Sequence, residues 1–316
     1  MANKSPRHAM DLTTLMESFG SVDKCRTYLE QLRFTGGVKC TKCQSDKISR
    51  IYKRNQFVCD ACKYQFSAMA GTIFHDTHLP LTKWFAAVYL MCESRKGISA
   101  NQLSRTLKVS YKTAWYLCHR IRTAVETNTE AKLSGTIEVD DSHIGGKSIN
   151  MHSDVRKRRI HGNAKRYGKT VALGALERNG NVRLSKSATA NREALHKFIR
   201  STMGLDAERI ITDEWNAYDG IDATGVKHEK VNHKAKEYVR GDVHTNGIEN
   251  VWSLFKRSIV GSFHHISDKH LDRYLDELEH RFNNRNNPYL FRDTLLRLIA
   301  SGNIEYKELT KKKKAA

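Results

Sequence analysis

Residues 136–146 read Thr-Ile-Glu-Val-Asp-Asp-Ser-His-Ile-Gly-Gly, and the pattern of the chain changes at this stretch. Apolar and polar residues alternate up to Val139, which is typical of a β-strand with one buried face. Asp140 follows at the predicted end of this strand, with Asp141 facing the opposite way, and the two glycines permit a sharp turn. The stretch therefore predicts an acidic side chain at the edge of a sheet.

Short β-rich runs continue from this point and alternate with helical patterns. The strands are predicted at 136–139, 170–176, 182–188 and 209–212, with a helix at 192–203 before the last of them. Two or three helices follow, at about 245–260, 268–283 and 290–301. This order predicts an α/β fold in which a mixed sheet is covered by helices. The basic, glycine-punctuated segment at 151–166 is predicted to be a loop.

Two further acidic residues are attached to core elements in the same way. Asp213 follows the apolar pair Ile210-Ile211, and Glu249 lies in the first turn of a predicted amphipathic helix. Lys256 lies on the same flank of that helix, about 10 Å further along its axis. Three carboxylates brought together can hold two Mg²⁺ (or Mn²⁺) ions, which activate a water and stabilise the leaving oxygen during displacement at phosphorus. Together with the large positive charge of the chain and its cysteine-rich segment, the acids predict a metal-dependent enzyme that cuts and rejoins DNA.

Each acidic residue also has a simpler explanation. Asp140 and Asp213 could be turn residues at strand ends, and Glu249 could form a capping box with Asn246. Their combination with a following lysine favours the metal site. His233 and the pair His264-His265 are candidates to assist the phosphate or the leaving group, although a histidine is more often a structural residue.

Four of the seven cysteines form two CxxC pairs, with 15 residues between the pairs. They are Cys40 with Cys43 and Cys59 with Cys62. This spacing predicts a four-thiolate site for structural Zn²⁺ rather than four unconnected cysteines. The segment has too few apolar residues to fold alone, so zinc binding would contribute to its folding free energy. Lysines and arginines surround the pairs, which favours contact with DNA over a merely solvated surface.

Residues 97–116 have the pattern of a helix-turn-helix. Ser99 is expected to cap the first helix and Ser110 the second, with the turn at 108–109. The start of the second helix is where base edges would be read in a major groove. The residues that we expect to contact DNA are Tyr111, Lys112, Thr113, Tyr116 and Arg120, together with Lys256 and Arg257. The alternative is a plain helical hairpin.

The charge balance fits a polyanionic partner. Among 316 residues, 54 are Lys or Arg and 34 are Asp or Glu, which gives a formal net charge of +20. Each cation placed on a phosphate releases condensed counterions. The apolar run at 84–92 is shorter than the roughly 20 residues of a membrane span, and no signal-peptide pattern begins the sequence. We expect a cytoplasmic, nucleoid-associated protein that binds double-stranded DNA and no membrane.

Taken together, the chain resembles the DDE transposases of bacterial insertion sequences, in the zinc-ribbon branch related to eukaryotic Merlin elements. The resemblance runs from about residue 25 to residue 300. The matching stretches are 40–62, 71–74, 79–91, 138–147, 213–218 and, at greatest length, 237–265. The resemblance implies a ribonuclease H-like catalytic domain, Mg²⁺-dependent transposition and recognition of terminal inverted repeats. It also implies a homodimer or larger assembly that holds transposon ends and target DNA.

The resemblance also assigns residues. Asp140, Asp213 and Glu249 stand where the family has its acidic triad, and Lys256 stands at its following basic residue. Some relatives carry asparagine where the third acid is expected, so Asn246 is a candidate to assist Glu249. The sequence departs from the family at 141–143, where Asp-Ser-His replaces the expected Glu, Ser or Thr, and Tyr.

These observations predict four regions. They are an N-terminal helical segment with the zinc ribbon (1–78), the helix-turn-helix region (79–130), the catalytic domain (134–302) and a basic tail (303–316). The leading hypothesis is a transposase that cleaves and transfers DNA strands by a two-metal mechanism. The alternatives are a non-catalytic DNA-binding protein, either a regulator or an inactivated transposase, and a nuclease that cuts without joining.

Overall fold

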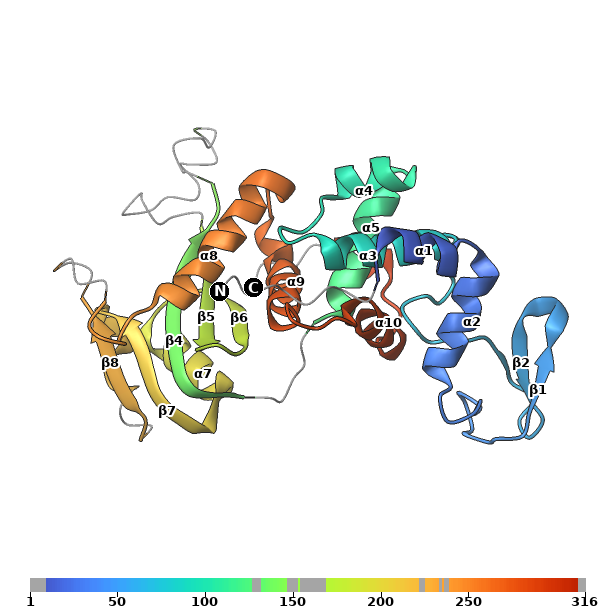
Figure 1. Cartoon of the computed structure of the whole chain (residues 1–316), viewed down its shortest axis with the longest axis horizontal. Helices are drawn as coiled ribbons and strands as arrows, with labels where there is room; N and C mark the ends of the chain where they lie inside the picture. Colours follow the sequence, from blue (N-terminus) through green and yellow to red (C-terminus); the bar gives the residue numbers. More distant parts are fainter. Residues whose placement is uncertain are drawn as a thin grey trace. The chain divides into compact units, whose positions relative to one another are not determined.

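The computed structural model describes residues 10–126, 132–146, 153, 169–221, 225–232, 235 and 239–311. It contains two compact units, one formed by residues 1–126 with 284–316 and the other by residues 127–283 (Figure 1). His233 lies outside the described residues, as does the predicted loop at 151–166 except for Ser153.

The unit at 127–283 is built on a five-stranded sheet. The strands are β4 (Leu133–Ile144), β5 (Thr170–Glu177), β6 (Val182–Ser187), β7 (Met203–Asp213) and β8 (Lys227–Val231). Their order is β6-β5-β4-β7-β8. β5 is antiparallel to β4 and β6, whereas β7 is parallel to β4 and β8. This mixed sheet with helices on both faces confirms the predicted α/β fold.

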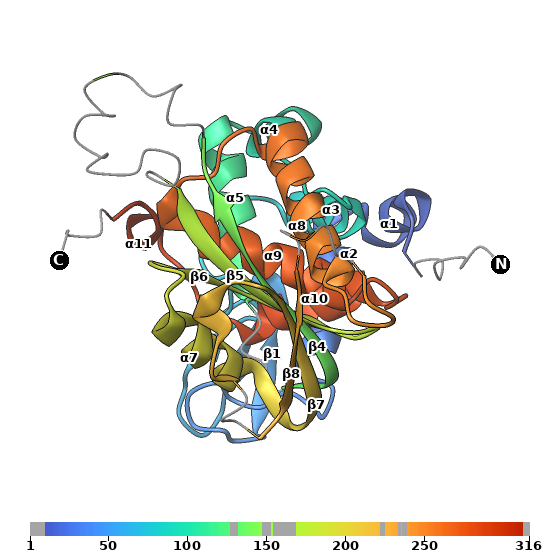
Figure 2. The same ribbon diagram turned by 90° about the vertical axis from the view of Figure 1, so that its left-hand side faces the viewer.

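Helices cover both faces of this sheet (Figures 1 and 2). The helix α7 (Arg192–Thr202) lies on one face, and α8 (Asn246–Ser258) and α9 (Leu271–Asn283) lie on the other. The strand period of two decides which residues face each layer. On β5, Leu173 packs in the core below α7, whereas Ala172 and Leu176 pack below α8 and α9.

A glycine allows α8 to approach the sheet closely. A Cβ added to Gly174 of β5 would lie 2.6 Å from Cζ2 of Trp252 and 2.9 Å from Cδ1 of Ile248. Both of these side chains belong to α8. Gly174 pairs with Asp140 across the β4–β5 ladder. The absence of a side chain at position 174 therefore brings α8 over the strand that carries the first acidic residue.

The other unit is mainly helical. Its helices are α1 (Leu12–Phe19), α2 (Val22–Arg33), α3 (Leu81–Glu93), α4 (Ala100–Leu107), α5 (Tyr111–Ala124), α10 (Leu290–Ala300) and α11 (Tyr306–Thr310). Ser99 and Ser110 cap α4 and α5 as predicted, each accepting a 3.1 Å hydrogen bond from a backbone amide three residues ahead. Lys108 forms the turn between these helices with a left-handed backbone (φ 49°).

The end of the chain departs from the expected division. We expected the catalytic domain to continue to residue 302, but α10 packs on α2, α3 and α5, where Leu295 and Leu298 are fully buried. The segment at 303–316, expected to be only a basic tail, contains α11 with Leu309 buried. An amphipathic pattern predicts a helix with one apolar face, but it does not specify which core buries that face.

Within the part of the chain that the structure describes, no helix combines the length and the apolar character that crossing a membrane requires.

Candidate active site and zinc centre

The four predicted cysteine ligands lie on a small ribbon of three strands. β1 (Ile48–Ile51), β2 (Gln56–Cys59) and β3 (Gln65–Phe66) form an antiparallel sheet in that order. Each cysteine pair is followed by a residue with positive φ, Gln44 (62°) and Lys63 (58°), which turns the chain back around the site. The hydrophobic core of this ribbon is small, as the composition of the segment predicted.

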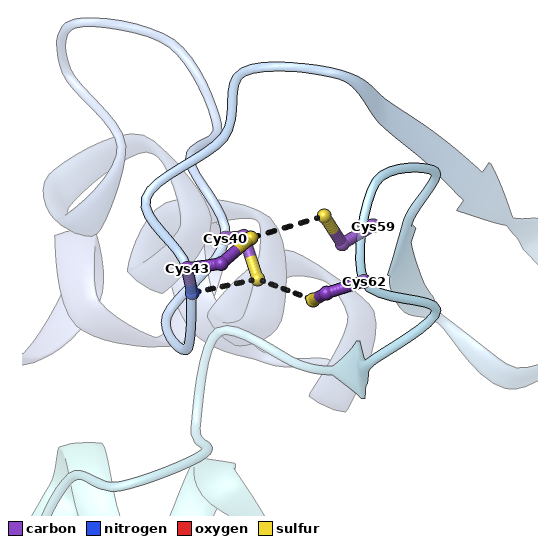
Figure 3. Close-up of side chains that lie close together, drawn as sticks. All are labelled: Cys40, Cys43, Cys59 and Cys62. Atoms are coloured by element: carbon purple, nitrogen blue, oxygen red, sulfur yellow. Dashed lines mark hydrogen bonds between the residues drawn. The ribbon is translucent and has the colours of Figure 1, made fainter.

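The cysteine sulfurs converge from the two pairs (Figure 3). All four Sγ atoms lie within 4.8 Å of one another. The distance is 3.6 Å between Cys40 and Cys62 and 3.5 Å between Cys43 and Cys59. A tetrahedral zinc ion with Zn–S bonds of about 2.3 Å would need sulfurs about 3.8 Å apart. The geometry and the donor chemistry both fit a structural zinc site.

Backbone amides prepare one of these thiols to act as a thiolate. Burial opposes ionisation of Cys40, but the amides of Cys43 and Lys42 donate to its Sγ and lower its pKa to about 6. Zinc binds the thiolate form of cysteine. These amides therefore favour the form of the ligand that the ion requires.

In the other unit, Asp140 lies within β4 rather than at its end. The prediction of a strand terminus was wrong, because β5 continues to pair with β4 as far as Ile144. What ends near Asp140 is the parallel pairing with β7, whose last pair is Glu138 with Ile211. Asp140 therefore lies where one neighbouring strand continues and the other stops.

Asp213 is the last residue of β7, as the sequence predicted for a strand terminus. It lies two residues after Ile211, just as Asp140 lies two residues after Glu138, the partner of Ile211. Neighbouring strands are about 4.8 Å apart, and residues two apart face the same side. Asp140 and Asp213 therefore extend from the same face of the sheet at the same level.

Glu249 is supplied by the first turn of α8. Its Oε1 accepts a 2.8 Å hydrogen bond from Oγ1 of Thr245, the residue that precedes the helix. The capping-box alternative with Asn246 is wrong, because Thr245 is the N-cap and Asn246 is an exposed residue of the helix itself. Glu249 is exposed and does not serve as a helix cap.

An open cavity of about 530 Å³ brings two of the acids together with the predicted cations. Asp140, Glu249, Lys256 and Arg257 all line it, and Trp252, Ser253 and Val260 complete its wall. Lys256 and Arg257 are exposed on α8. The lining of the cavity therefore combines two carboxylates with two positively charged side chains.

The electrostatics of Asp140 reflect this crowding of acids. Burial raises the pKa of its carboxyl group to about 7, and the nearby charges of Asp141, Asp213 and Glu249 contribute to the same shift. Tyr218 is fully buried beside them, and burial raises the pKa of its hydroxyl well above the usual value. That hydroxyl makes no hydrogen bond within the described part of the chain.

The two candidate metal sites differ in how tightly they are assembled. Across the described residues, the four cysteines are the one group of three or more metal-ligating side chains whose donor atoms all lie within 4.8 Å of one another. The oxygens of Asp140, Asp213 and Glu249 do not meet that condition together. The acids are electrostatic neighbours, but they do not form a closed three-ligand cluster.

The assisting residues that the structure describes do not line the cavity. His264 and His265 are exposed after the π-helical turn Ile259–Phe263, and His264 has a positive φ of 58°. Neither histidine lines the cavity. Asn246 is exposed at the start of α8, and His233 is not among the described residues.

The residues expected to contact DNA from α5 fall into two groups. Tyr111 and Lys112 are exposed at the start of the helix, and Thr113 is partly exposed. Tyr116 donates a hydrogen bond to the carbonyl of Ile304.

Arg120 is not available at the surface, contrary to the expectation. The residue is 5% exposed, and its guanidinium lies over the ring of Trp84. It donates hydrogen bonds to the carbonyl of Ile73 and to Oδ1 of Asn303. Arg120 therefore contributes to the packing of α5, because the helix face that carries it is turned into the core.

Two residues around the acids were not predicted from the sequence. Glu138 is buried on β4 and contacts α8, and Trp252 lines the cavity beside Asp140. A signal for Glu138 was present, since it is an ionisable residue between the apolar residues of a predicted core strand. Nothing in the sequence indicated which helix it would meet.

Comparison with known proteins gives two family matches. Residues 132–283 match the ISXO2-like transposase domain, and residues 20–65 match the transposase zinc-ribbon domain. The two matches cover the sheet unit that carries the acids and the ribbon that carries the cysteines. The chain thus belongs to the insertion-sequence transposases with a DDE domain and an N-terminal zinc ribbon, as the resemblance predicted.

Two relatives agree with this family. One is an "uncharacterized protein in transposable element ISH50" of Halobacterium salinarum, 28% identical over 254 residues, which are 77% of this chain and 84% of the relative. The other is an "uncharacterized transposase-like protein" of Haemophilus influenzae, 35% identical over 75 residues, which are 24% of this chain and 59% of that protein.

Among solved structures, the chain is similar to one in the cryoEM structure of the simian T-cell lymphotropic virus intasome in complex with PP2A regulatory subunit B56 gamma. The identity is 12% and the TM-score 0.28, over 56% of this chain and 63% of that chain. A likeness at this level supports no inference about this protein.

Proposed function

We propose that this protein is a transposase that binds the terminal inverted repeats of an insertion sequence and catalyses cleavage and transfer of DNA strands. The observation that supports this most directly is the cavity in which Asp140 and Glu249 meet Lys256 and Arg257. Asp213 ends the strand that neighbours the strand of Asp140, and its charge contributes to the raised pKa of Asp140. Carboxylates beside cations in one cavity suit a phosphodiester whose charge increases during displacement.

The three acids fit a pair of divalent cations. Two catalytic metal ions lie about 3.5–4 Å apart, and each Mg²⁺–oxygen bond is about 2.0–2.1 Å. Carboxylates that bind opposite ions can therefore be roughly 8 Å apart, so a two-metal site does not need all three acids in mutual contact. Asp140 and Asp213 would bind from the sheet and Glu249 from α8. Two bound Mg²⁺ ions would supply an activated water and stabilisation of the leaving 3′ oxygen.

The residues of the chain itself would orient the DNA. Lys256 and Arg257 line the cavity, where they would bind the phosphates that flank the scissile bond. Thr245 would hold the carboxylate of Glu249 in place through its hydrogen bond to Oε1. After cleavage, the released 3′ hydroxyl would take the place of the water and attack a phosphodiester of the target strand, so that a new P–O bond forms as the bond to the target's own 3′ oxygen breaks.

Recognition of the element ends would fall to the other unit. Tyr111, Lys112 and Thr113 at the start of α5 would enter the major groove, and the basic residues around the zinc ribbon would bind the phosphate backbone. Tyr116 would hold α5 through its bond to Ile304. Because transposition joins two ends, we propose a dimer or larger assembly on DNA.

A cleavage assay tests this proposal. Full-length zinc-loaded protein is incubated with Mg²⁺ or Mn²⁺ and linear DNA that carries the ends of the element encoding it. Wild type is compared with Asp213→Asn and Glu249→Gln. We expect cut and joined products from wild type only, with losses on the order of 10³-fold or more in the variants, as for groups that act together in catalysis.

The other outcomes separate the alternatives. Equal cleavage by wild type and both variants would show that the acids are wrongly assigned. Cut ends without joined product would indicate a nuclease. Binding to the element ends without any metal-dependent nicking would favour a non-catalytic DNA-binding protein.

A further inference from the structure

A buried ion pair joins the strand of the first acid to the helix of the third. Glu138 lies on β4, two residues before Asp140 and on the same face, and its side chain is 1% exposed. Its Oε1 accepts hydrogen bonds from Nε and Nη2 of Arg178, at 3.1 and 3.0 Å. Its Oε2 accepts a 3.1 Å bond from the backbone amide of Ile248, in the first turn of α8.

This contact replaces an ordinary helix cap. The first amides of a helix have no partners within the helix, and Thr245 makes no side-chain cap bond to them. The carboxylate of Glu138 satisfies one of them from a strand that is distant in the sequence. A negative charge at this position also interacts favourably with the positive end of the helix dipole.

Arg178 extends the same connection to the segment before α8. Its Nη1 donates to the carbonyl of Asp242 at 2.8 Å, and its Nη2 donates to the carbonyl of His244 at 3.1 Å. Arg178 itself directly follows β5, and its backbone amide binds the carbonyl of Thr136 on β4. One guanidinium thus ties the entry to α8 to the central strands of the sheet.

At Gly247, α8 approaches Glu138 so closely that no side chain would fit between them. A Cβ added to Gly247 would lie 2.6 Å from Oε2 of Glu138 and 2.7 Å from Cδ2 of Leu176. The depth of α8 above the sheet is therefore set at this point by a glycine on one side and a carboxylate on the other. Glu249 follows only two residues later.

We propose that Glu138 and Arg178 are positioning residues that fix the first turn of α8 against β4, and thereby hold Glu249 at the distance from Asp140 that two bound cations require. This inference rests on the proposed function of the acids. It assigns neither residue to the metal or to DNA, since both oxygens of Glu138 are already occupied within the protein.

The molecule supplies a matched control for the test. Glu279 on α9 has a similar arrangement. Its Oε1 accepts a 2.8 Å hydrogen bond from Nη1 of Arg183, and its Oε2 accepts a 2.9 Å hydrogen bond from the backbone amide of Leu184. Its side chain is 5% exposed. This pair ties α9 to β6 and neither of its residues lines the acidic cavity. Glu279→Gln therefore removes an equivalent buried charge without affecting the first turn of α8.

The test compares wild type, Glu138→Gln and Glu279→Gln in cleavage of element-end DNA, with Asp213→Asn as the catalytic control. We expect Glu138→Gln to lower kcat and the apparent affinity for Mn²⁺ by about 10–100-fold, the usual effect of losing a group that orients metal ligands. KM for DNA should change little, because the DNA contacts remain. Glu279→Gln should lower thermal stability about as much as Glu138→Gln does, but it should leave kcat near that of wild type.

A second variant separates geometry from charge. Gly247→Ala keeps the ion pair but forces α8 away from Glu138, so we expect the same loss of kcat. If Glu138→Gln and Glu279→Gln lose activity equally, the ion pair is only structural and the inference is wrong.

Failure of the proposed function would look different. In that case wild type would neither bind Mn²⁺ nor cut DNA. Hydrogen exchange of the amides at 248–252 would still report on the position of α8. These amides should lose protection in Glu138→Gln and keep it in Glu279→Gln. Unchanged protection in Glu138→Gln would overturn the inference whatever the activity.

Discussion

The cysteine site and the acidic site differ in how their ligands are brought together. The four cysteines lie within residues 40–62 of one small ribbon, and their sulfurs already converge. The acids come from β4, β7 and α8, and their oxygens do not all meet. The ribbon has a minor core, whereas the acids extend from a sheet with helices packed on both faces.

This difference indicates which of the two regions needs its metal ion in order to fold. A ribbon with few buried side chains depends on its metal for folding, because the free energy of zinc binding is then part of the folding free energy. The sheet unit has its own core and can hold its acids near one another without cations. Zinc should therefore be essential to the fold of the first region, and Mg²⁺ only to the chemistry of the second.

Removal of zinc should have the largest effect. We expect Cys43→Ser to unfold the ribbon, since zinc in such sites contributes about 10–16 kcal/mol of apparent binding free energy. Limited proteolysis and zinc release would measure this, with the unit at 127–283 remaining resistant. Cys92→Ser is the control, because Cys92 contacts Thr294 among the helices and not the ribbon. A protease-resistant ribbon in zinc-free Cys43→Ser would remove the contrast between the sites.

Replacement of Asp140 should have the next largest effect, of opposite sign for stability and activity. The pKa of this carboxyl group is about 7 in the folded protein and 3.8 when unperturbed, mainly because of burial and then of the neighbouring acids. The folded state therefore binds a proton more tightly than the unfolded state, and stability falls as the pH rises between these values. Asp140→Asn removes the free-energy cost of ionising this buried group. It also removes a proposed metal ligand.

We expect Asp140→Asn to abolish metal-dependent cleavage while raising stability at pH 8 by at least about 1 kcal/mol, or about 2–4 °C. Most of the gain should be lost by pH 4, where the folded protein keeps the carboxyl group protonated and the unfolded chain also binds part of a proton. Thermal unfolding without Mg²⁺ measures it, and Asp206→Asn, at an exposed position of β7, is the control. A gain that is the same at pH 4 and pH 8 would contradict this explanation.

The same contrast explains what could be predicted from the sequence. The zinc ligands were identified from spacing alone, and the caps of α4 and α5 from Ser99 and Ser110, because each depends on residues close in the chain. Asp213 was correctly placed at the end of a strand because the apolar pair before it marks that strand. Local patterns contain this information.

The remaining features depend on which elements pack together. β4 continues beyond Asp140 because β5 pairs with it, and no pattern within 136–146 specifies that partner. Arg120 appeared as a surface cation on a helix but is buried against Trp84 from α3. The contact of Glu138 with α8 joins residues 110 positions apart. Periodicity predicts a buried face, but it does not predict the element that covers it.

A moderate effect is expected from Gly174→Ala, which alters the packing of the acidic site without touching an acid. The added Cβ would meet Trp252 at 2.6 Å, so α8 must shift from the sheet. Overpacking of this kind costs about 1–3 kcal/mol, and we expect cleavage to fall with it. Gly302→Ala is the control, since a Cβ there meets nothing within 4 Å. Full activity in Gly174→Ala would show that the acids tolerate movement of α8.

The smallest effects are expected from replacing single lysines. These variants test whether the two regions contact DNA for different purposes. Lys112 is exposed at the start of α5 with its Nζ 4.7 Å from the centroid of the Tyr306 ring, whereas Lys256 lines the acidic cavity. Each alanine variant should lower the slope of log affinity against log salt by about 1, as for loss of one phosphate contact. Only Lys256→Ala should also lower kcat, because only Lys256 lies where charge develops at the reacting phosphate. An equal loss of kcat in Lys112→Ala would mean that end recognition and chemistry are not divided between the regions, since a contact made by α5 would then contribute to the transition state.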